Sequence, residues 1–146
     1  MIDPGTVRNV SDLRPLLDRF WDVSAQSLDQ LQQHADPGAG APVYTVDGKY
    51  TSRGWTEWTQ GFQFGSALLQ FDATDEVRFL ESGRDATLVH MPVHLTHVGV
   101  HDHGFNNVST YGNLWRLARE DRFETTPAEL AGWELALKVS GAVQAV

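Results

Sequence analysis

The 146-residue chain contains no cysteine, so it can form neither a disulfide nor a thiolate metal site. Basic residues are scarce, with 11 Lys and Arg against 19 Asp and Glu and a formal net charge of −8. This charge repels phosphate backbones and anionic lipid, and we expect no nucleic-acid or membrane partner. No stretch approaches the ~20 apolar residues of a membrane span, and no basic segment followed by an apolar run opens the chain. We expect a cytoplasmic protein.

Apolar residues recur at helical spacing along most of the chain. The spacing predicts five helices, over residues 12–33, 56–71, 75–92, 104–120 and from 127 onward, with Thr74 as a cap and Val108 among the buried positions. Turn residues fill positions 35–54, where residues 43–46 are the only run of β-formers, so this stretch is a long loop or holds one short hairpin. The fold class expected is all-α.

Five of the six histidines fall between positions 90 and 103. On one helix, His90 and His94 would share a face, and Asp102 or Glu81 could complete a mixed nitrogen and oxygen shell around zinc. Pro92 falls between the two histidines, and no Glu follows His90 as in the His-Glu-x-x-His pattern. A histidine-rich helical metal protein is therefore kept as an alternative to the interpretation developed below, which needs no metal and no cofactor.

The segment from Val100 to Phe105, Val100-His101-Asp102-His103-Gly104-Phe105, directly precedes the predicted fourth helix. A carboxylate next to an imidazole can orient sugar hydroxyls or exchange protons. The alternative is that Asp102 only caps the helix and Gly104 only makes the turn. The pair alone does not decide between these two interpretations.

A strip of aromatic residues surrounds three glycines where the long loop leads into the predicted second helix. Sugar rings have apolar faces and a polar rim, so a sugar site needs aromatic platforms beside amide groups. The alternative is packing of one helix on the next. The candidates for substrate contact in this strip are Trp55, Trp58, Gln63 and Phe64.

Together the two strips resemble glycoside hydrolase family 88, the unsaturated glucuronyl hydrolases. The run Trp58-Thr59-Gln60-Gly61-Phe62-Gln63-Phe64-Gly65 is similar to the family's Trp-Thr-x-Gly-Phe-Trp-x-Gly, and His101-Asp102-His103-Gly104-Phe105 is similar to its His-Asp-x-Gly-Phe. Phe71-Asp72-Ala73-Thr74-Asp75-Glu76 looks like the family's helix-helix corner, and Trp115-Arg116-Leu117-Ala118 like its next helix end. The resemblance spans about residues 54–120.

The resemblance implies an (α/α)₆ barrel that removes a 4,5-unsaturated uronic acid from the non-reducing end of an oligosaccharide by hydration of the double bond. Asp102 matches the first of the family's two essential aspartates, and His101 matches its neighbour in the substrate pocket. Gln63 stands where the family has a stacking Trp, for which Trp55 or Phe64 could compensate. Val100 stands where the family often has an acidic residue, directly before the His-Asp pair.

No aspartate matches the family's second one, and twelve helices with their loops need about 200 residues. We therefore expect residues 1–146 to be the N-terminal part of a single α/α-barrel catalytic domain, an incomplete barrel of about five helices with little or no activity by itself. Three hypotheses remain: a carbohydrate hydrolase segment, a histidine-rich helical metal protein, and a non-catalytic helical interaction domain.

Overall fold

The computed structural model describes residues 9–34, 40–99 and 101–145, so Val100 and positions 35–39 of the long loop lie outside the described part. The chain is mostly helical, as the all-α prediction requires at the level of fold class. Within the described residues, none of the helices has the length and apolar character needed to cross a membrane.

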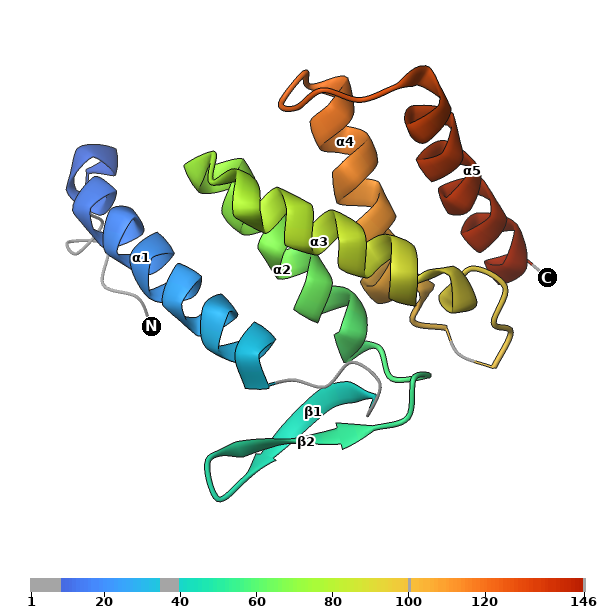
Figure 1. Ribbon diagram of the computed structural model, residues 1–146, viewed down its shortest axis with the longest axis horizontal. Coiled ribbons are helices and arrows are strands. Elements are labelled where there is room, and N and C mark those ends of the chain that lie inside the picture. Colours follow the sequence, from blue (N-terminus) through green and yellow to red (C-terminus); the bar gives the residue numbers. More distant parts are fainter. Residues whose placement is uncertain (1–8, 35–39, 100, 146) are drawn as a thin grey trace.

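The helices alternate in direction along the chain (Figure 1). Three of them run toward the end of the molecule that carries the hairpin: α1 (Val10–His34), α3 (Val77–His90) and α5 (Pro127–Gln144). The others run away from it: α2 (Thr59–Thr74), then the π-helix η4 (Gly104–Gly112), which continues into α4 (Asn113–Arg119). A short 3₁₀ turn, η3 (Pro92–His94), follows α3. The loops at the hairpin end therefore lie together.

The hairpin consists of β1 (Ala41–Val46) and β2 (Lys49–Arg53), paired antiparallel. Asp47 and Gly48 join the strands, and both have positive φ, 50° and 73°. Two-residue hairpin turns of this kind need left-handed backbone, which an Asp-Gly pair adopts at low cost. Of the two readings of residues 35–54, the short hairpin is the one observed.

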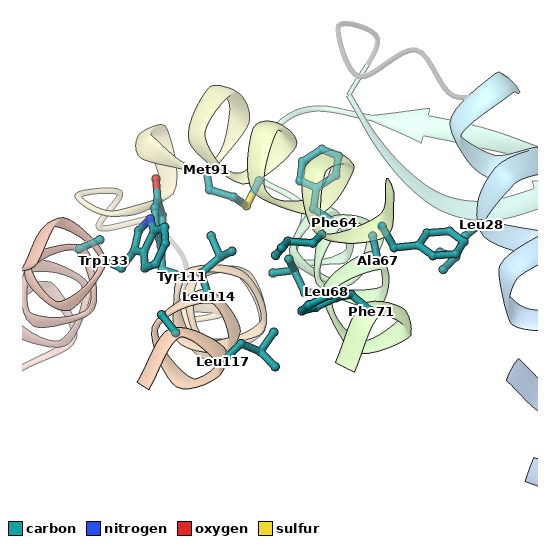
Figure 2. Packing of buried hydrophobic residues seen from close by; sticks show 14 residues of the cluster. Leu28, Phe64, Ala67, Leu68, Phe71, Met91, Tyr111, Leu114, Leu117 and Trp133 are labelled. Carbon is teal, nitrogen blue, oxygen red and sulfur yellow. The ribbon is translucent and has the colours of Figure 1, made fainter. Parts of the chain in front are cut away.

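Helix α2 lies at the centre of the apolar core (Figure 2). Its buried face packs against Leu28 of α1, Phe79 and Leu80 of α3, and Leu114 of α4. Trp133 brings α5 into the same cluster. The buried residues shown and labelled in Figure 2 are Leu28, Phe64, Ala67, Leu68, Phe71, Met91, Tyr111, Leu114, Leu117 and Trp133.

Helices α2 and η4 approach each other closely because glycines face the contact. A Cβ added to Gly61 would lie under 3.0 Å from the carbonyl oxygen of Phe105, and one added to Gly65 would lie 2.5 Å from that of Ser109. Any side chain at either position would push the two backbones apart. This contact joins the two segments that the sequence singled out.

Ion pairs hold the opposite ends of the same helices. Arg116 of α4 donates to Asp72 of α2 at 2.7 Å, and Arg122 donates to Asp72 at 2.6 Å and to Asp75 at 2.8 Å. Asp75 ends α2 in the left-handed region, with φ 59°. The corner between α2 and α3 is thereby tied to the end of α4.

Two details of the sequence prediction are wrong. Thr74 does not cap α3: it is the last residue of α2 and donates its hydroxyl to the Gln70 carbonyl at 2.8 Å, while Glu76 precedes α3. Val108 is 59% exposed, because the wider winding of η4 turns Asn106, Asn107, Thr110 and Tyr111 inward instead. The last helix begins at Pro127, as predicted, and Thr126 caps it in a capping box with Glu129 as its partner.

Replacing Gly61 by Ala should destabilise the fold by about 1–3 kcal/mol, the range typical of overpacking, because backbone atoms of η4 occupy the space that the methyl group needs. Chemical denaturation of the purified variant measures the loss. The control is Gly132→Ala in α5, where nothing lies within 4 Å of the added Cβ and where Ala favours the helix by about 0.5–1 kcal/mol. Equal stability of the two variants would contradict the close contact.

Candidate functional site

The two motif segments meet at the hairpin end of the helices. The backbone N–H of Gly61, in the first turn of α2, donates to Oδ1 of Asn106 in η4 at 3.1 Å. This bond is buried, and Asn106 is 1% exposed. It satisfies an N–H that the start of a helix otherwise leaves unpaired. Residues 58–65 and 101–106 therefore form one continuous unit.

Three rings make up an aromatic cluster on the surface of this unit: Trp58, Phe62 and Phe105. Their centroids are 5.4 to 5.6 Å apart, with Trp58 edge-on to Phe62 and tilted toward Phe105. The rings remain 40%, 40% and 48% exposed. An open apolar face of this kind, beside polar groups, is the surface that the ring of a sugar requires.

Trp55 lies apart from the aromatic cluster and packs against histidines instead. Its ring is edge-on to His94, with centroids 5.6 Å apart, and to His97 at 5.0 Å. It is 46% exposed. Trp55 thus links the segment before α2 to the connection between α3 and η4.

Asp102 lies in the turn just before η4, which begins at Gly104 after His103. Its carbonyl accepts from the N–H of Asn106 at 3.1 Å, and its side chain is 17% exposed. His101 is 95% exposed, with Nε2 3.7 Å from Oδ1 of Asp102. The carboxylate therefore lies at the end of η4 that carries Phe105 of the aromatic cluster.

The other two predicted contact residues lie differently. Phe64 is a core residue: it is 6% exposed and stacks on His90, with ring centroids 5.3 Å apart, so its packing leaves a sugar no access to the ring. Gln63 is partly buried, and its Oε1 has no hydrogen-bond partner. This oxygen is itself buried, so the structure does not present it to a ligand at the surface.

Beneath the exposed residues, His94 connects α2 to η4. Its Nδ1 accepts from Nδ2 of Asn106 at 3.1 Å, and its Nε2 donates to Oε1 of Gln60 at 3.3 Å. An imidazole with one donor and one acceptor is neutral. Burial, together with repulsion from His97 and His103, lowers the pKa of His94 from 6.5 to about 4.

His103 makes an equivalent connection to α5. Its Nε2 donates to the carbonyl of His97 at 2.7 Å, so its Nδ1 is left to accept from the hydroxyl of Ser140 at 2.9 Å. Asn107 donates to Ser140 Oγ at 3.0 Å and to the His94 carbonyl at 3.3 Å. The segment that begins η4 is therefore bonded on one side to α2 and on the other to α5.

The geometry needed for the metal alternative does not form. Helix α3 ends at His90, and His94 belongs to η3 beyond Pro92, so the two imidazoles do not share a helix. His90 stacks on Phe64, and His94 binds two amides. Across positions 9–34, 40–99 and 101–145, no three His, Asp or Glu side chains gather as metal ligands.

Comparison of the chain with protein-family models, with curated proteins and with solved structures finds no match.

Asn106 and Ser140 were not predicted from the sequence as part of the site, and His94 and His103 were singled out without the buried hydrogen bonds that the structure gives them. The sequence contains one signal that could have indicated Asn106. Asn106 and Asn107 are adjacent inside a helix, although Asn competes with helical hydrogen bonds and is a poor helix former. A pair of such residues in a buried position indicates side chains that bind polar partners there.

Acid should weaken the fold in a window set by His94. The folded state holds His94 neutral with a pKa of about 4, whereas the unfolded chain protonates near 6.5 and so binds more protons between these values. The free energy of unfolding should therefore fall as the pH is lowered from about 6.5 to about 4. Denaturant titrations at a series of pH values measure it.

The control for this pH dependence is His94→Gln, which keeps an acceptor and a donor but cannot titrate. The difference in unfolding free energy between the wild-type protein and this variant should shrink with decreasing pH across the window. A constant difference would show that His94 is not held neutral.

Proposed function

We propose that this chain is part of a carbohydrate hydrolase that acts on oligosaccharides ending in a 4,5-unsaturated uronic acid, as its resemblance to unsaturated glucuronyl hydrolases implies. The observation that carries the proposal is the union of the two motif segments. Gly61 is bonded to Asn106, and Trp58 contacts Phe105, so residues separated by more than forty positions form one surface. Asp102 lies three residues before Phe105 in the chain, and its carbonyl accepts from the N–H of Asn106.

The helix arrangement supports an α/α toroid as the parent fold. In Figure 1, the odd-numbered helices run one way and α2 and η4–α4 run the other. The two helices that run away from the hairpin pack on each other through Gly61 and Gly65 and carry much of the core. An (α/α)₆ barrel repeats this arrangement, with such helices as its inner ring.

In the proposed reaction, water adds across the double bond of the sugar: one carbon receives a proton and the other receives the hydroxyl. Asp102 would position and polarise the sugar and take part in the proton exchange, beside the second carboxylate that the resemblance implies and that no aspartate of residues 1–146 matches. Its partly buried position limits competing water, and the exposed imidazole of His101, 3.7 Å away, would contact the sugar's polar rim. Trp58 would support the apolar face of the ring, with Gln63 and Trp55 in further substrate contacts.

Asp102→Asn should lower the rate of disaccharide hydrolysis by about 10²-fold or more, since an amide cannot exchange the proton. The assay uses the full-length gene product and follows the loss of ultraviolet absorbance of the 4,5 double bond. The matched control is Asp85→Asn, whose carboxylate is 75% exposed on α3 and should leave the rate unchanged.

Two results would contradict the assignment at different levels. If the wild-type protein leaves every unsaturated disaccharide unchanged, the hydrolase proposal fails for those substrates. If Asp102→Asn keeps the full rate while the wild-type protein is active, Asp102 is not the catalytic group.

Trp58→Ala should weaken binding of an unsaturated disaccharide by about 2- to 12-fold, because an aromatic contact contributes about 0.5–1.5 kcal/mol. Titration by calorimetry measures the dissociation constant. Tyr50→Ala is the control, since this ring is 63% exposed on the hairpin and belongs to no part of the proposed site. Equal weakening by both substitutions would count against the aromatic cluster as the platform.

One observation favours a helical interaction domain as a second candidate. Helix α1 exposes apolar side chains at positions that share one helical face, and they are between 39% and 56% exposed: Leu13, Leu16, Leu17 and Phe20. A contiguous apolar stripe on a helix surface is typical of a contact with another helix. This stripe lies outside the proposed saccharide site.

A further inference from the structure

The segment that carries Asp102 is fixed from two sides by buried side chains. Asn106 bonds to α2 through Gly61, and His103 bonds to α5 through Ser140. Both residues are at most 4% exposed. His101, which precedes both of them in the chain, is almost fully exposed. The position of the Asp102 carboxylate therefore depends on groups that do not reach the surface themselves.

The orientation of the Asn106 amide is determined by its partners. Oδ1 accepts from the Gly61 N–H, a bond that only this atom of the amide can make, so the Nδ2 group must face His94. His94 Nδ1 must then be an acceptor. Its proton resides on Nε2, where Gln60 accepts it at 3.3 Å. The chain of bonds from Gln60 through His94 to Asn106 has one consistent arrangement of protons.

The contacts of His103 are less constrained. Ser140 Oγ lies 2.9 Å from its Nδ1 and can donate to it or accept from it, and Nδ2 of Asn107 lies 3.4 Å from the same nitrogen. Protonation of His94 would set an N–H against the NH₂ of Asn106, and no rotation of the amide relieves this without breaking the bond to Gly61.

We propose that His94 is a positioning residue for Asp102: as a neutral imidazole, it holds Asn106, and through Asn106 the first turn of η4, against α2. The catalytic part of this inference rests on the proposed hydrolase function. Its structural part, that His94 sets the position of residues 102–106, stands independently of that function.

Burial and two neighbouring histidines disfavour the charged form of His94. The titratable groups that act on it are His97 and His103, and both repel a positive imidazole. Trp55 covers one side of the ring. Burial and these two histidines hold the pKa of His94 at about 4, so the neutral form persists through the range in which an ordinary histidine titrates.

The experiment compares His94→Leu with His94→Gln in the full-length gene product. Leu leaves the amides of Gln60 and Asn106 without their partner, whereas Gln can donate to one and accept from the other. His34→Gln, on exposed α1, is the matched control. Two readouts are used: the amide NMR signals of Phe105 and Asn106, and kcat and KM for an unsaturated disaccharide.

We expect His94→Leu to shift both amide signals and to lower kcat by about 10²-fold with a smaller change in KM, the effect of a misplaced catalytic group. His94→Gln should restore the signals and most of kcat, and His34→Gln should change neither. If His94→Leu does not fold, acid titration of the wild-type protein replaces it, and the same two signals should move when the His94 imidazole protonates.

The possible results separate this inference from the proposed function. Unchanged Phe105 and Asn106 signals in His94→Leu, or unmoved signals as His94 protonates, would overturn the positioning role. Shifted signals with an unchanged kcat would overturn its catalytic part. If the signals shift in His94→Leu while the wild-type protein turns over no unsaturated disaccharide, the positioning role is supported and the hydrolase proposal is refuted.

Discussion

The close approach of α2 to η4 is the constraint on which the rest of the structure depends. Because Gly61 and Gly65 carry no side chain, the backbones come near enough for Asn106 to reach the first turn of α2. The same approach brings Trp58 and Phe62 onto Phe105. Wider spacing would separate the aromatic cluster from the segment of Asp102 and would expose the bonds beneath it.

The two ends of this helix pair use different interactions. At the corner between α2 and α3, Arg116 and Arg122 bind Asp72 through partly exposed charged groups. At the hairpin end, the buried side chains are neutral amides and imidazoles, and each histidine donates once and accepts once. Neutral groups cost less to bury than charges do, and they fix orientation through hydrogen bonds. The apolar core of Figure 2 lies between these two polar ends.

Local signals in the sequence were sufficient for most of the fold. The helical spacing, the turn residues around the β-formers at 43–46 and the start of a helix at residue 127 depend on neighbouring residues, and the structure contains the helices, the hairpin and α5 that they predict. The inward face of η4 was not predictable from the α-helical period, because its π winding follows from contacts with α2 and from side chains that bind its own carbonyls, such as Thr110 on Asn106 at 2.6 Å.

The candidate site shows the same division between local and tertiary information. The positions of Asp102, Trp58 and Phe105 at one end of the helices follow from the order of the elements, whereas Phe64, an aromatic residue of the same strip, is buried against His90. Its helical position turns it away from the aromatic cluster. The roles of His94 and Ser140 depend on partners 12 and 37 positions away in the sequence, and neither has a local signature.

The π winding of η4 also gives the helix an uneven pitch. Each turn of η4 takes up more residues than a turn of α4, so the angular offset between Asp102 and the core residues of α4 is set by the length of the wide segment as well as by residue count. A one-residue deletion within residues 104–112 would rotate residues 101–103 about the helix axis relative to the core residues of α4. The number of residues in η4 therefore sets the direction in which the Asp102 side chain points.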